Sequence, residues 1–97
     1  MLASQPNSLA QAAPAVARWR EMASLGKVRQ RRTQSGRDAW FLDFHPALRG
    51  QQRFLWGDRG HSFESEEHAE AVLAMVRHDA LRFPAAEAVE QYRRPLD

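Results

Sequence analysis

The chain contains no cysteine, which excludes a disulfide framework, a thiol nucleophile and a thiolate zinc site. The same absence suits a reducing compartment, so we expect a cytoplasmic protein. No apolar run approaches the roughly 18 residues that a membrane span requires, and residues 1–11 lack the basic and apolar segments of a signal peptide. A length of 97 residues is enough for one domain with a single small core.

Lysine is also scarce, because 13 of the 14 basic residues are arginine. Residues 1–59 hold ten basic residues against four acidic ones, whereas residues 60–97 hold four against eight. Such a split favours one basic surface that meets a polyanion, and arginine binds phosphate or a guanine edge with two hydrogen bonds. A GC-rich genome would also raise the share of arginine, but it does not explain the clustering.

The stretch Ala39-Trp40-Phe41-Leu42-Asp43-Phe44 places three aromatic residues within six positions. Large planar side chains are favoured on a half-buried strand, and alternate residues of a strand share a face. Pro46 ends this strand because it has no N–H to donate. The predicted core face carries Trp40, Leu42 and Phe44, and the predicted free face carries Phe41, Asp43 and His45.

Two further strands and a turn complete a predicted antiparallel sheet. Residues 27–33 alternate weakly, with Lys27, Arg29 and Arg31 on one face, and the turn at residues 34–37 joins them to residues 39–45 as a hairpin. After a connection over residues 46–51, residues 52–56 form the third strand. A turn at residues 57–60 follows, and residues 61–63 briefly extend the sheet.

A strong amphipathic helix is predicted from Glu66 to Arg82, with Ser65 as its N-cap and acidic residues in its first turn. Pro84 ends it. Its apolar stripe has one available partner, the core face of the sheet. The stripe consists of Ala69, Val72, Leu73, Val76, Ala80 and Phe83.

The fold class that follows is α+β, with a three-stranded antiparallel sheet packed on one C-terminal helix and a short N-terminal helix in addition. We expect residues 1–13 to be a disordered tail and residues 14–25 to form the short helix, with Val16, Trp19 and Ala23 on one side and Gly26 after its end. Residues 27–83 form the domain, and residues 84–97 are predicted to be a tail or linker, with at most one or two further helical turns at residues 85–93 before Pro95.

At residues 53–70, RFLWGDRGHSFESEEHAE, the chain resembles the small N-terminal DNA-binding domain of phage integrases and other tyrosine recombinases. The shared features are a basic residue, an aromatic strand, a D-R-G turn, a Ser cap and an acidic helix start. The resemblance covers about residues 27–82. It implies sequence-specific binding of double-stranded DNA by a three-stranded sheet in the major groove, with other domains of a longer recombinase as further partners.

Carried over by position, the resemblance implies DNA contacts from six basic residues. Phe41 and Asp43 lie on the same predicted face and join this set. Asp43 either accepts from a cytosine amino group, or orients an arginine, or is a solvated strand residue, and we expect the last. The basic contacts are Lys27, Arg29, Arg31, Arg32, Arg37 and Arg53.

We expect no enzyme activity, because the only tyrosine, Tyr92, lies in the predicted tail and no recombinase catalytic set is present. We also expect no metal or cofactor. His61 and His68 lie near two glutamates, but surface residues beside a helix cap account for them.

Two alternatives to DNA remain. A double-stranded RNA-binding domain has the same element order, yet carries lysines where this chain has Glu66 and Glu67. A protein-interaction module would expose Phe41 and Trp56.

Overall fold

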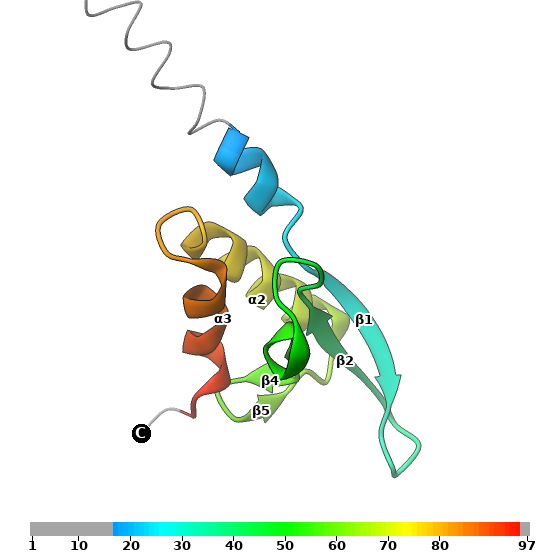
Figure 1. Cartoon of the computed structure of the whole chain (residues 1–97). Helices are drawn as coiled ribbons and strands as arrows, with labels where there is room; N and C mark the ends of the chain where they lie inside the picture. Colours follow the sequence, from blue (N-terminus) through cyan, green and yellow to red (C-terminus); the bar gives the residue numbers. More distant parts are fainter. Residues whose placement is uncertain (1–16, 96–97) are drawn as a thin grey trace, which may run out of the picture.

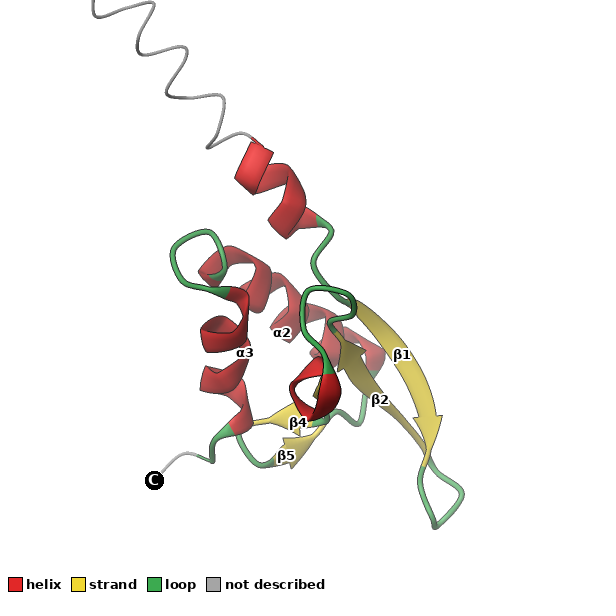
Figure 2. Ribbon diagram, viewed as in Figure 1, coloured by secondary structure: helices red, strands yellow, loops and turns green. Residues whose placement is uncertain are grey.

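The computed structural model describes residues 17–95 (Figures 1 and 2). Residues 17–23 are helical and precede the sheet. The elements that follow are β1 Lys27–Arg32, β2 Asp38–Asp43, the 3-10 helix η1 Gly50–Arg53, β3 Phe54–Leu55, β4 Gly57–Asp58, β5 His61–Ser62, α2 Glu66–Asp79 and α3 Ala85–Arg93.

The main sheet has three antiparallel strands in the order β1-β2-β3, which confirms the predicted fold class. The third strand is shorter than predicted, because residues 50–53 form η1 and only Phe54 and Leu55 pair with β2. Strands β4 and β5 form a separate two-stranded sheet. Phe63 nevertheless bridges to the main sheet, since its carbonyl accepts the N–H of Trp40 at 3.1 Å.

Helix α2 packs against the predicted core face of the sheet. Its N-cap is confirmed, because the Ser65 hydroxyl oxygen accepts the N–H of His68 at 3.1 Å. The helix ends at Asp79, three residues before the predicted end, and Phe83 is therefore 41% exposed instead of lying on the buried stripe. The other five stripe residues are buried together with Leu42, Phe44, Leu55 and Phe63.

Helix α3 corrects the prediction of a tail or linker after residue 83. Ala88, Val89 and Tyr92 are buried in the same core cluster as α2. The Tyr92 hydroxyl donates to the Asp79 carboxylate at 3.0 Å, and burial raises the pKa of Tyr92. Figure 1 shows α3 beside α2, on the side of the molecule away from the tip of the β1–β2 hairpin.

The helical segment at residues 17–23 lies within the predicted helix of residues 14–25 and is held against α2 on both sides; near its start, Arg18 donates to the carbonyl of Ala80 at 2.9 Å. Gly26 has a φ of +72°, as a residue after a helix terminus often does. Arg77 of α2 donates to the carbonyls of Leu25 and Gly26 at 2.7 and 2.9 Å. Trp19 on this segment is 59% exposed and does not join the buried core. Val16 and the predicted tail of residues 1–13 lie outside the described residues.

Candidate nucleic-acid interface

The face of the sheet opposite α2 carries a row of basic residues from β1. The register pairs Lys27 with Asp43, Arg29 with Phe41 and Arg31 with Ala39. Directly paired residues of an antiparallel sheet lie on the same face, so the predicted grouping of Lys27, Arg29 and Arg31 is confirmed. The residues between them pair with the core face of β2, as Val28 does with Leu42.

Three aromatic rings form a cluster beside this row. The ring centroids of Phe41 and Phe54 are 5.8 Å apart, those of Phe41 and Trp56 are 4.9 Å apart, and those of Phe54 and Trp56 are 5.3 Å apart. Arg31 lies over Trp56, with its guanidinium carbon 5.5 Å from the ring centroid, and Arg53 lies over Phe54 at 4.8 Å. These are distances at which a cation is attracted to a ring.

We call the combined surface the aromatic–arginine face. It consists of Lys27, Arg29, Arg31, Phe41, Asp43, Arg53, Phe54 and Trp56. Sequence reasoning placed Phe41 in the site but omitted Phe54 and Trp56 from it. The available signal was their spacing of two residues, which puts both rings on one face of an extended segment.

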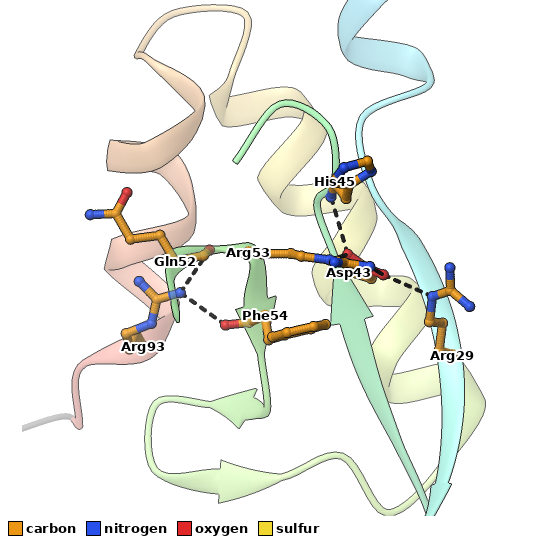
Figure 3. A network of polar contacts seen from close by, with 7 residues as sticks. All are labelled: Arg29, Asp43, His45, Gln52, Arg53, Phe54 and Arg93. Atoms are coloured by element: carbon orange, nitrogen blue, oxygen red, sulfur yellow. Dashed lines mark hydrogen bonds and ion pairs between the residues drawn. The ribbon is translucent and has the colours of Figure 1, made fainter. Parts of the chain in front are cut away.

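Asp43 lies at the centre of the aromatic–arginine face and is only 1% exposed, so the expectation of a solvated residue is wrong. Figure 3 shows its carboxylate between Arg29 and Arg53. The Nε of Arg29 donates to Oδ2 at 2.9 Å, while Arg53 donates from Nε to Oδ1 at 2.7 Å and from Nη2 to Oδ2 at 2.9 Å. The backbone N–H of His45 also donates to Oδ1 at 3.1 Å.

This environment holds the pKa of Asp43 well below its ordinary value of 3.8. The hydrogen bond from Arg53 is the largest cause, and it outweighs burial, which acts in the opposite direction. Asp43 is therefore a carboxylate at neutral pH. Because two of the three roles considered for Asp43 require access to water or to a base, its burial leaves the third, the orientation of arginines.

Another arginine, Arg93, holds the backbone behind the aromatic cluster. Arg93 of α3 donates from Nη2 to the carbonyl of Gln52 at 3.2 Å and to that of Phe54 at 2.9 Å (Figure 3). Its Nη1 is paired with Glu90 at 2.6 Å, and this contact lowers the pKa of Glu90. Helix α3 thus positions η1 and β3, and through them Arg53 and Phe54.

The two remaining predicted contact residues, Arg32 and Arg37, lie at the tip of the β1–β2 hairpin and not on the aromatic–arginine face. Arg32 pairs with Asp38 at 3.7 Å, and Arg37 pairs with Glu64 at 3.9 Å. Both arginine side chains are at least 75% exposed. Exposed ion pairs of this length contribute little to stability, so both guanidinium groups can exchange their carboxylate for a phosphate.

A groove of about 820 Å³ adjoins Trp56 where β3 meets the β4–β5 sheet. Its walls include Phe54, Trp56, His61, Ser62 and Arg93. Only glycine fits at position 57 beside the groove, because a Cβ there would clash with the backbone carbonyl of His61. The groove continues the apolar part of the aromatic–arginine face.

His68, near the start of α2, has structural contacts. The Nε2 of His68 lies 3.0 Å from the Asp58 carboxylate, and its ring meets the ring of Phe63 edge-on with centroids 5.2 Å apart. Among residues 17–95, no three histidine, aspartate or glutamate side chains gather as a metal-binding group.

No protein-family model, curated protein or solved structure gives a significant match to this chain. Within the described part of the chain, no helix has the length and apolar character needed to cross a membrane.

Proposed function

We propose that this chain binds double-stranded DNA by placing the aromatic–arginine face in the major groove. The observation that carries the proposal is the division of the sheet: α2 covers one face, and the other presents Lys27, Arg29, Arg31 and Arg53 around a single buried carboxylate. Excess positive charge on one face supplies the salt-dependent affinity typical of DNA-binding proteins.

The dimensions of the sheet favour the major groove over the minor groove. The major groove is about 12 Å wide and admits a β-ribbon, whereas the minor groove is about 6 Å wide. With β1 and β2 in the groove, Arg32 and Arg37 at the hairpin tip reach toward the backbone phosphates. Apolar atoms of Phe41 and Trp56 would meet thymine methyl groups, which also line the major groove.

The resemblance to integrases gives the proposal its biological context. The chain would act in the cytoplasm as the N-terminal DNA-binding part of a phage integrase or another tyrosine recombinase, with the chemistry carried out by other domains. The contacts of Tyr92 support this division, because its hydroxyl is bound to Asp79 and the residue is 4% exposed. A nucleophile needs access to its substrate.

The charge at the start of α2 argues against double-stranded RNA. Glu66 and Glu67 occupy its first turn and are exposed, where an RNA-binding domain of the same element order places lysines. The aromatic cluster is the feature that a protein partner would use. The DNA proposal therefore predicts that the basic residues, and not the rings alone, determine affinity.

The test is the salt dependence of binding to a duplex DNA fragment. Four to six phosphate contacts predict a slope of log K against log salt of about −4 to −6. Replacing both Arg29 and Arg31 by alanine should weaken binding at every salt concentration and flatten this slope. The matched control is Arg82→Ala, which removes an exposed charge next to the end of α2. A wild-type slope near zero would refute DNA binding.

A further inference from the structure

Arg29 and Arg53 share one carboxylate but use different parts of their guanidinium groups. A guanidinium carries five N–H donors: one on Nε and two on each Nη. Arg53 engages Asp43 through Nε and Nη2 together, so the side edge of its guanidinium faces the carboxylate. Arg29 engages Asp43 through Nε alone.

Arg53 is held as a brace. Besides its two bonds to Asp43, its guanidinium lies over the Phe54 ring, and its side chain is 34% exposed. The hydrogen bond with Asp43 raises the pKa of Arg53 above its ordinary value. Movement of Arg53 toward DNA would break both bonds to a carboxylate that is itself buried.

The outer edge of the Arg29 guanidinium, formed by Nη1 and Nη2, has no partner within residues 17–95. Figure 3 shows its two terminal nitrogens pointing away from Asp43, and neither makes a hydrogen bond within residues 17–95. The side chain is 45% exposed. Two parallel N–H groups of this kind match the O6 and N7 atoms that guanine presents in the major groove.

We infer that Arg29 is the residue of the aromatic–arginine face that reads a guanine, and that Asp43 and Arg53 hold it in position. The inference rests on the proposed function. The inference gives Arg29 a different role from Lys27. Lys27 is a flexible cation on the same face, and the structure gives it no ion pair among the described residues. Lys27 would then contact phosphate, which adds affinity without sequence preference.

The test is a binding selection from a library of duplex DNA with a randomised segment, carried out with the wild-type chain and two variants. Arg29→Met keeps the length of the side chain and removes the donors, and Lys27→Met is the matched control. Wild type should enrich a site that contains a required guanine. With Arg29→Met, that guanine should lose its advantage by about tenfold or more, while preferences elsewhere in the site persist.

Lys27→Met should instead weaken binding to all sequences alike and reduce the salt slope by about one. If Arg29→Met does not fold, Arg29→Lys replaces it, because lysine retains a charge for Asp43 but has no second edge for guanine. Circular dichroism of each variant establishes which one is used.

Three results would overturn the inference, and they have different consequences for the proposed function. Enrichment of the same guanine by the Arg29 variant would show that another residue reads it. Salt-dependent binding without any enriched site would show that the face binds DNA without reading it, which leaves the proposed function intact. Absence of duplex binding by the wild-type chain would refute the proposed function as well.

Discussion

The two faces of β2 bury neighbouring residues to the same extent by different means. Leu42 is 0% exposed and Asp43 is 1% exposed, although their side chains point in opposite directions. Leu42 lies in the apolar core under α2, where removal from water stabilises the fold. Asp43 lies under two arginines that supply opposite charge and hydrogen bonds. The face without a helix is thus an organised polar surface rather than a merely solvated one.

The largest effect is expected from a charge placed on the apolar side. Val76 of α2 is 0% exposed, and Val76→Asp would put an unpaired carboxylate into the core. The penalty of several kcal/mol is comparable to the whole stability of a small domain, so we expect this variant to be unfolded by far-UV circular dichroism. Met75→Asp is the control, because Met75 is 46% exposed and the same charge there should leave the fold intact. A folded Val76→Asp would refute the packing of α2 on the sheet.

A second test of the apolar face concerns the close approach of Gly26 to the ring of Phe44. A Cβ on Gly26 would lie 2.6 Å from Cδ1 of Phe44, in a backbone with φ of +72°. Gly26→Ala should therefore lower the free energy of unfolding by about 3 kcal/mol, through backbone strain and overpacking together. Gly36→Ala isolates the strain, because Gly36 has a φ of +84° and open space around it, and we expect about 1–2 kcal/mol. Equal losses in urea denaturation would mean that the contact with Phe44 is unimportant.

On the polar side, the decisive change is Asp43→Asn, which removes the negative charge but keeps the shape. We expect a loss of about 2 kcal/mol, less than for a wholly buried ion pair because Arg29 and Arg53 are partly hydrated. Asp38→Asn removes a charge from an exposed pair at 3.7 Å and should change stability by less than about 0.5 kcal/mol. If both variants melt alike, Asp43 does not organise the face.

The smallest effect is the pH dependence that Asp43 contributes. Its folded-state pKa lies below the ordinary 3.8, so its contribution to stability is fully present above about pH 4 and is lost as the pH falls below that value. Between pH 6 and pH 3 the difference in unfolding free energy between wild type and Asp43→Asn should shrink by about 1 kcal/mol. Urea denaturation at the two pH values measures it, and a constant difference would contradict the assignment.

Local patterns in the sequence were sufficient for β1, β2 and most of α2. Alternation separated Leu42 and Phe44 from Phe41, and Ser65 with its acidic neighbours marked the start of the helix. The C-terminal helix was under-predicted: one or two further turns were expected at residues 85–93 within a tail, and α3 is instead a nine-residue helix packed into the core. Short apolar residues among charged ones carry a weak signal, and their burial depends on contacts with α2 that no local pattern contains.

The candidate site was predicted less completely than the fold, for a physical reason. Alternation correctly assigned Asp43 to the side of Arg29, but a lone carboxylate on a strand is normally hydrated. Its burial results from Arg53, ten residues away in a 3-10 turn that Arg93 of α3 supports. Such a network depends on tertiary structure, and only the set of basic residues, not their pairing, is visible in the sequence.

The most direct test of DNA binding by the free face of the sheet is an NMR titration of the ¹⁵N-labelled chain with duplex DNA and, separately, with duplex RNA. The proposal predicts amide shifts with DNA along residues 27–43 and 53–56, with α2 unchanged along its exposed side and a weaker response to RNA. Shifts centred on α2, or an equal response to both duplexes, would contradict it.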